Sequence, residues 1–136
     1  MDVQAARKRL ANIKKLTPEQ QADALALPDA VFGLAKNGQA AETLALIEQF
    51  SPGQQAAILA APYAVIGLAN NGQAAETIRL IEKLSPDQQT TVLDAPHAAV
   101  SLVINRQSEA VERIRRAAES WRTRALTANQ PTNLGR

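Results

Sequence analysis

Residues 50–83 read FSPGQQAAILAAPYAVIGLANNGQAAETIRLIEK, and residues 16–49 read LTPEQQADALALPDAVFGLAKNGQAAETLALIEQ. Aligned without gaps, the two segments are identical at 22 of 34 positions. A third copy over residues 84–116 begins LSPDQQTTVLDAPHAAVSL and diverges toward its end. Residues 1–15 resemble the last part of a copy, because Leu10 and Ile13 fall one period before Leu44 and Ile47. The chain is therefore a tandem repetition of a 34-residue unit.

Each copy contains signals for three short helices. A hydroxyl residue, a proline and a glutamine form a capping box at the start of the first helix (Thr17, Pro18 and Gln20 in the first copy). A second proline (Pro28, Pro62 and Pro96) is expected to end this helix and to open the second one. Asn37-Gly38 and Asn71-Gly72 predict a left-handed end of the second helix, and the third helix is expected from Gln39 and Gln73.

The expected fold is all-α, because helices this short are marginal alone and stacked copies would cover their apolar faces. We predict a short α-solenoid of three 34-residue repeats, with an N-terminal half repeat and an extended C-terminal capping helix. A compact bundle is the alternative if the copies curl tightly. The predicted single domain covers residues 1–126, followed by a flexible tail. Its parts are the cap 1–15, the repeats 16–49, 50–83 and 84–116, the capping helix 107–126 and the tail 127–136.

The composition excludes several classes of site. The 136 residues include no cysteine and one histidine, which exclude disulfide frameworks, thiolate metal sites and sites with several histidines in one chain. Hydrophobic residues make up 46% and aromatic residues only 3%, as expected for closely packed helices rich in Ala, Leu, Ile and Val. No nucleophile, paired carboxylate or glycine-rich phosphate loop stands out. We therefore expect no catalytic residues, no metal, no cofactor and no small-molecule ligand.

Charge is segregated along the chain although the total is only +2. Residues 1–15 carry a net +4, residues 16–105 a net −6 and residues 106–136 a net +4. The basic ends would solubilise the molecule and discourage stacking of molecules end to end. Alternatively, they would contact phosphate or an acidic partner. The candidate contacts are Arg7, Lys8, Arg9, Lys14, Lys15, Arg115, Arg116, Arg122 and Arg124.

Positions that vary between copies are the candidate partner-binding residues. The residue after the second proline is Asp29, Tyr63 or His97, and the first turn of the second helix should present these three as a row. A second row contains Arg79 and Arg113, with Ala45 at the equivalent place in the first copy. Unconstrained drift at surface positions is the alternative interpretation of both rows.

Parts of each copy resemble known repeat families. The run Gly67-Leu-Ala-Asn-Asn-Gly-Gln-Ala-Ala-Glu-Thr-Ile-Arg-Leu-Ile-Glu82 resembles the helix pair of ankyrin repeats. The Ser-Pro-x-Gln start and the three-helix length are similar to Pumilio-type repeats, which implies base recognition through a few side chains per repeat. Leu16-Thr-Pro-Glu-Gln20 with Gln39-Ala-Ala-Glu-Thr43 is similar to TAL-effector DNA-binding repeats. No single resemblance spans a whole copy, which suggests a bacterial α-solenoid of another family.

We expect a non-enzymatic protein–protein interaction module, for which a bacterial effector or adaptor role would be consistent. The alternative is a nucleic-acid-binding helical repeat that uses the basic ends. The chain has no apolar run long enough to cross a membrane and no N-terminal secretory signal, so we predict a cytoplasmic protein without membrane contact. Translocation by a specialised secretion system is left open.

Overall fold

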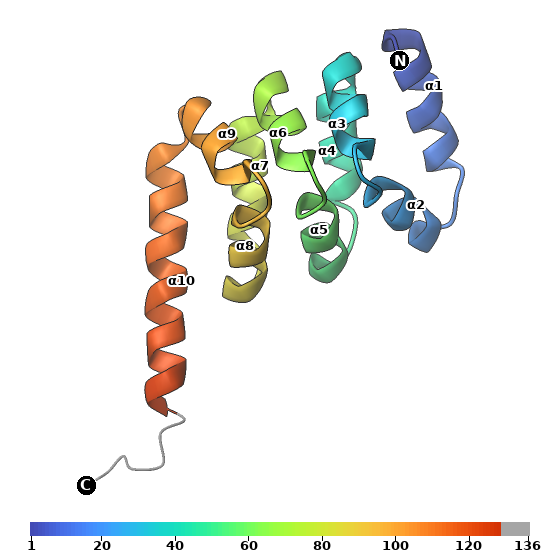
Figure 1. The fold of residues 1–136 in the computed structure, drawn as a ribbon. Helices are drawn as coiled ribbons and strands as arrows, with labels where there is room; N and C mark the ends of the chain where they lie inside the picture. Colours follow the sequence, from blue (N-terminus) through green and yellow to red (C-terminus); the bar gives the residue numbers. More distant parts are fainter. Residues whose placement is uncertain (129–136) are drawn as a thin grey trace, which may run out of the picture.

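A computed structural model describes residues 1–128, which are all helical apart from turns and contain no strand. The all-α prediction is confirmed (Figure 1). The elements are α1 (Val3–Lys14), α2 (Pro18–Leu25), α3 (Ala30–Leu34), η1 (Ala35–Gln39), α4 (Ala40–Ile47), α5 (Pro52–Leu59), α6 (Ala64–Leu68), η2 (Ala69–Gln73), α7 (Ala74–Glu82), α8 (Pro86–Leu93), α9 (Ala98–Ile104) and α10 (Ser108–Ala128).

Capping boxes start α2, α5 and α8, as the sequence predicts. At α5 the Ser51 Oγ accepts from the Gln54 backbone N–H at 3.3 Å, and Gln54 Oε1 accepts from the Ser51 N–H at 3.3 Å. The next residue has a second role that the sequence analysis missed. Buried Gln55 donates through Nε2 to the carbonyl oxygens of Glu48 (3.1 Å) and Phe50 (2.9 Å), so it caps the end of the preceding helix.

The prediction that the second proline opens the second helix is wrong. The helices α3, α6 and α9 begin two residues later, and the intervening residue takes a left-handed conformation with φ of 65° at Asp29, 64° at Tyr63 and 61° at His97. The chain reverses direction here between two packed helices. A regular first turn starting at proline would not allow this reversal, and the left-handed residue supplies it.

The predicted left-handed end of the second helix is confirmed, with φ of 92° at Gly38 and 90° at Gly72. The asparagine before the glycine supports the turn, since Asn71 Nδ2 donates to the Gly67 carbonyl at 2.7 Å. The third copy keeps this conformation without glycine, because Arg106 has a φ of 71°. The third helices begin at Ala40 and Ala74, one residue later than predicted.

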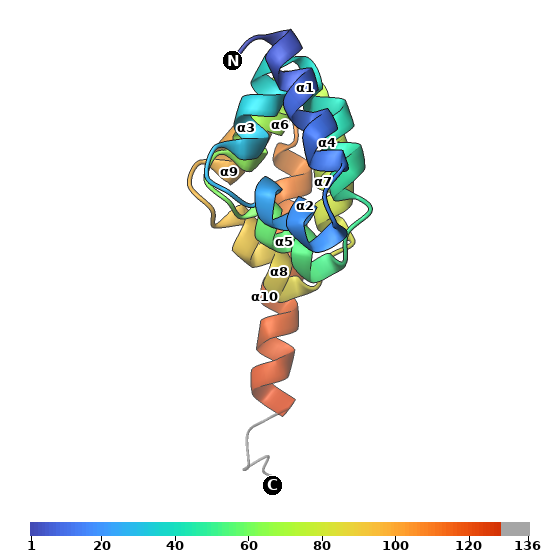
Figure 2. The same cartoon turned by 90° about the vertical axis from the view of Figure 1, so that its right-hand side faces the viewer.

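Equivalent helices of successive copies lie side by side. The helices α2, α5 and α8 form one row, and α3, α6 and α9 form a second (Figures 1 and 2). The helices α4 and α7 lie along a third side of the molecule, and α1 packs on α3 and η1 at one end (Figure 2). The contact between α3 and α6 is especially close, because a Cβ added to Gly67 would lie 2.8 Å from the Phe32 Cα.

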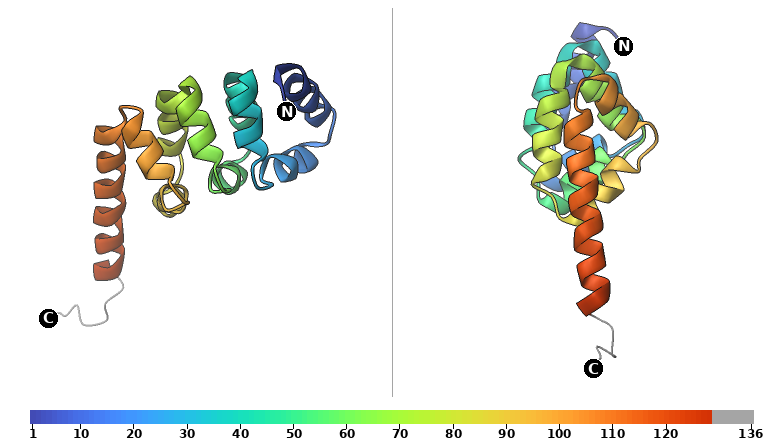
Figure 3. Two further views of the ribbon diagram at one scale, coloured as in Figure 1. Left: turned by 45° about the horizontal axis from the view of Figure 1, so that its top comes forward. Right: turned by 90° about the vertical axis from the view of Figure 1, so that its left-hand side faces the viewer.

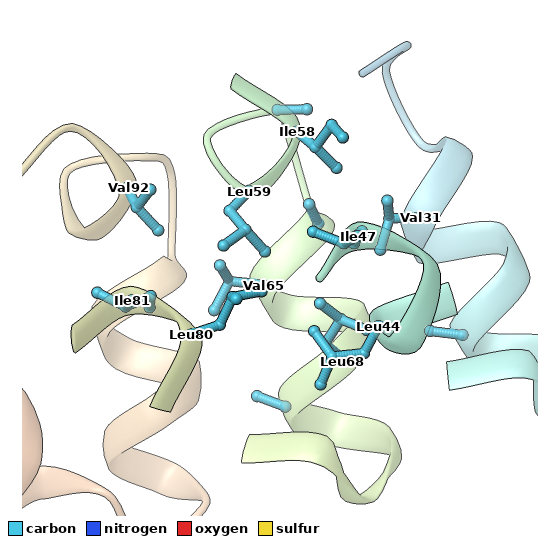
Figure 4. Packing of buried hydrophobic residues seen from close by; sticks show 14 of the residues in the cluster. Val31, Leu44, Ile47, Ile58, Leu59, Val65, Leu68, Leu80, Ile81 and Val92 are labelled. Carbon is cyan, nitrogen blue, oxygen red and sulfur yellow. The ribbon is translucent and has the colours of Figure 1, made fainter. Parts of the chain in front are cut away.

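One continuous hydrophobic cluster joins all the copies, from Ala6 in α1 to Ile114 in α10. Its largest fully buried side chains are leucine, isoleucine and valine contributed by neighbouring helices, including Leu44, Leu59, Leu68 and Ile81 (Figure 4). Small alanines fill the space between them, which explains the low aromatic content. The core therefore crosses every copy boundary and is not divided into separate cores.

The last helix differs from its counterparts α4 and α7. It begins at Ser108 and continues to Ala128, so Thr127 and Ala128 are helical although they were predicted to start the tail. The rest of the predicted tail, residues 129–136, lies outside the described residues. The C-terminal part of α10 extends past α8 and away from the other helices (Figures 1 and 3).

Candidate functional site

The residues Asp29, Tyr63 and His97 lie in the turns that precede α3, α6 and α9. Each is the N-cap residue of its helix, whereas the sequence predicts it within the first helical turn. All three are exposed, and their turns follow one another along one edge of the molecule (Figures 1 and 2). We call these three residues the turn row. The structure thus brings them onto one edge, each attached to a rigid helix.

The middle member of the turn row contacts the preceding copy. The rings of Tyr63 and Phe32 have centroids 6.0 Å apart at an angle of 56°, a favourable tilted arrangement. The Lys36 Nζ lies 5.7 Å from the centroid of the Phe32 ring. Tyr63 is nevertheless 45% exposed. A partner at this edge would therefore meet a tyrosine already held in position.

The second predicted row is brought together only in part. Arg79 on α7 and Arg113 on α10 line one shallow open hollow, together with Arg106 from the turn before α10. Arg113 also forms an ion pair with Glu82, with 3.0 Å between Nη2 and Oε2. One of the two predicted arginines is therefore already engaged with an acidic side chain of its own chain.

The basic residues of α1 and of its C-cap position are all exposed at one end of the molecule, namely Arg7, Lys8, Arg9, Lys14 and the C-cap residue Lys15. Within residues 1–128, none of these five forms an ion pair. They surround the helix on the sides not occupied by the inward-facing Ala6, Leu10 and Ile13. The N-terminal end therefore presents an unbalanced positive surface.

The predicted arginines of α10 are engaged to a greater extent. Arg115 pairs with Asp94 at 3.6 Å, and Arg116 pairs with Glu112 at 2.6 Å. Arg122 donates to the Thr90 Oγ1 at 3.3 Å. Arg124 is exposed on the extended part of the helix. Because α1 and α10 lie at opposite ends (Figure 1), the two basic groups do not form one continuous patch.

An exposed apolar surface at the C-terminal end was not anticipated from the sequence. Val100, Val103 and Ile104 lie one helical turn apart or less on α9 and are exposed, with Ile104 at 72%. Two of these positions hold Ala35 and Lys36 in the first copy and Ala69 and Asn70 in the second. A column-by-column comparison of the copies would have revealed this increase in apolar character.

In the part of the chain that the structure describes, no three acidic or histidine side chains converge as metal ligands would. None of the described helices is both long enough and apolar enough to cross a membrane. The chain matches no protein-family profile, no curated protein and no solved structure. The candidate site therefore rests on the geometry of this chain alone.

Proposed function

We propose that the chain is a short α-solenoid that binds another protein through the turn row. The support for a solenoid is the 34-residue repetition together with the packing of equivalent helices in rows. In a solenoid each repeat contacts its neighbours only, and the exposed edge becomes an extended binding surface. Such a surface is already ordered before binding, which reduces the entropy cost of association.

The observation that carries the binding proposal is the backbone conformation of the turn row. A left-handed conformation costs residues other than glycine, asparagine and aspartate about 1 kcal/mol or more, and such strain concentrates at functional sites. All three copies adopt this conformation at the same place, two of them with the strained residues Tyr63 and His97, and each displays a different polar or aromatic side chain: Asp29, Tyr63 and His97. A purely structural turn would favour glycine, as at Gly38 and Gly72. Side-chain identity at the turn row is thus the feature we assign to partner recognition.

Affinity capture with the full chain tests this proposal. The test variant replaces Asp29, Tyr63 and His97 together by alanine. Each turn then still holds a residue with a Cβ in the left-handed conformation, and only the rest of the side chain is removed. The matched control replaces the exposed acidic residues Glu19 and Asp87, on α2 and α8, by alanine. We expect a partner that is retained by the wild type and the control and lost by the triple variant. Equal recovery of every partner by the triple variant would contradict the proposal, provided that circular dichroism shows all three proteins folded.

Nucleic-acid binding is the second candidate, favoured by the five unpaired basic side chains on α1 and at its C-cap position. Their contact with phosphates would release counterions, so the affinity for RNA or DNA should fall steeply as salt increases. Replacing Lys8, Lys14 and Lys15 by glutamine should reduce that salt slope. The absence of binding at low salt would exclude this candidate. The net charge of −6 over residues 16–105 makes it the weaker of the two, since the repeats themselves repel phosphate.

A further inference from the structure

The C-terminal end of the helix array lacks the polar cover expected of a terminal repeat. Directly after α3 and α6, at the starts of η1 and η2, Ala35 and Ala69 face the next copy, and each is only 1% exposed because that copy covers it. The equivalent residue of α9 is Val103, which the described helices leave 46% exposed. A terminal repeat normally places polar residues on such a face. Val103 is instead larger than the equivalent Ala35 and Ala69, and it is apolar.

The neighbouring position changes in the same direction. Lys36 and Asn70 are polar, and Asn70 Oδ1 accepts a hydrogen bond of 2.7 Å from Asn105 of the next copy. The third copy has Ile104 at this position, 72% exposed. Val100, Val103 and Ile104 therefore form an apolar face, which we call the end face. Beside it lies an open hollow between α9 and α10, lined by Val103, Val111 and the side chains of Glu112, Arg115, Arg116 and Glu119.

The size of these side chains indicates what can cover the end face. Between α3 and α6, Gly67 comes so close that an added Cβ would lie 3.4 Å from the Ala35 Cβ. Val103 stands at the position of Ala35, and its larger side chain would block an equally close approach. A further helix that crossed α9 through a glycine, as α6 crosses α3, therefore does not fit. Two helices that each present valine and isoleucine pack at the ordinary separation of about 8–10 Å. The end face thus suits a surface like itself.

The charges around the end face also suit a copy of the same surface. Two acidic residues (Glu112 and Glu119) and two basic residues (Arg115 and Arg116) surround the hollow. A partner of one charge sign would be attracted by half of them and repelled by the other half. A twofold axis lets opposite charges of the two copies meet, as self-complementary interfaces require. The ion pairs of Arg113, Arg115 and Arg116 within the chain reduce the repulsion between two basic C-terminal ends.

From this we infer that two copies of the chain associate through their end faces, with α9 against α9 about a twofold axis. The N-terminal end is a poorer partner for the end face, because the unpaired basic residues of α1 would meet a rim of mixed charge. Association of unlike ends would also continue indefinitely into filaments. The twofold contact closes at two copies.

Sedimentation velocity and light scattering of the full chain over a broad concentration range test this inference. We expect a mass that rises to that of a dimer and no further. Ile104→Lys restores the residue type of position 36 and should weaken the dimer by about tenfold or more, because it buries an ammonium group against apolar side chains. Leu126→Lys is the matched control, since Leu126 is similarly exposed but lies on the extended part of α10. It should leave the dimer unchanged.

Charge reversal gives an independent measurement. Glu119→Arg should weaken the dimer, because it removes an acidic partner for the arginines of the other copy. A mass that stays monomeric at every concentration would overturn the inference, as would a dimer that Ile104→Lys leaves intact. A mass that keeps increasing beyond two copies would show association of unlike ends. Thermal unfolding checks that each variant is folded, which is expected because the substituted side chains are exposed.

Discussion

The second and third copies have the same caps and turns, yet they differ at two places where the second copy uses glycine for close packing or a left-handed turn, Gly67 and Gly72. Gly67 permits the close crossing of α3 and α6, and the equivalent residue of α9 is Ser101, which is buried with its hydroxyl donating to the Ala98 carbonyl at 2.9 Å. The helix α9 packs less extensively on α6 than α6 does on α3. The looser packing of α9 on α6 thus leaves room for the side chain of Ser101.

The left-handed turn shows the same difference. Gly72 adopts its φ of 90° without steric cost, while Arg106 adopts 71° in the third copy with a full side chain. Packing restricts the residue at Gly67, where an added Cβ would meet the Phe32 Cα, whereas nothing lies within 4 Å of a Cβ added at Gly72. At Gly72 only the positive φ restricts the residue type. The outer copy retains the conformation through its remaining contacts, including the bond of 2.7 Å from Asn105 Nδ2 to the Ser101 carbonyl. Packing between copies thus decides which residue is tolerated at the helix crossing, and backbone conformation decides it at the left-handed turn.

The largest effect is expected from truncating the inner core. Leu68→Ala should lower the free energy of unfolding by about 2–5 kcal/mol, because Leu68 is fully buried between copies. Leu102 is equally buried in the outer copy, and its truncation should cost less, since α9 can move into the cavity from its open side. Urea unfolding measures both. A larger loss of unfolding free energy for Leu102→Ala than for Leu68→Ala would contradict the expected difference between inner and outer copies.

The crossing residues give the next largest difference. Gly67→Ala should cost about 1–3 kcal/mol, because its new Cβ would meet the Phe32 backbone. Ser101→Ala changes the equivalent residue to the same alanine and should cost about 1 kcal/mol or less through its lost hydrogen bond. Gly53→Ala is the control, since nothing lies within 4 Å of its added Cβ in helix α5, and it should stabilise. Destabilisation by Gly53→Ala equal to that of Gly67→Ala would refute the steric explanation.

The left-handed turns should respond in opposite directions. Gly72→Ala should destabilise by about 1 kcal/mol, because alanine is strained at positive φ. Arg106→Gly should stabilise by up to about 1 kcal/mol for the same reason. Thermal unfolding of the two variants measures this contrast. Loss of stability by both variants would show that Arg106 makes contacts that outweigh its backbone strain. Stabilisation by Gly72→Ala would show that alanine is not strained at this turn.

The smallest effect is expected at the ion pair that joins the two copies. Arg113→Ala removes the contact with Glu82, whose side chains are 60% and 37% exposed. Exposed pairs contribute about 0–1 kcal/mol and are screened by salt. The difference from wild type in urea unfolding should therefore be small at low salt and disappear at high salt. A loss that persists at high salt would indicate that the arginine stem contributes by packing.

Local sequence signals predicted the helices well and their junctions less well. The capping boxes and the glycine turns follow from residue chemistry within a few positions, so they could be predicted. The left-handed conformation of Asp29, Tyr63 and His97 could not, because no residue there favours it as glycine would. It results from the way two packed helices constrain the turn between them. The exposure of Ile104 also depends on which helix lacks a neighbour.

By itself the sequence determined an all-helical chain, its 34-residue period, the helix caps and the residue types available on each copy. These features depend on contacts within a few residues or on simple repetition. Only the tertiary structure decided that the turn row lies along one exposed edge and that the basic ends lie apart. It also decided that α9 presents an uncovered apolar face. Such features depend on which helices meet across copies, and packing between distant residues sets that arrangement.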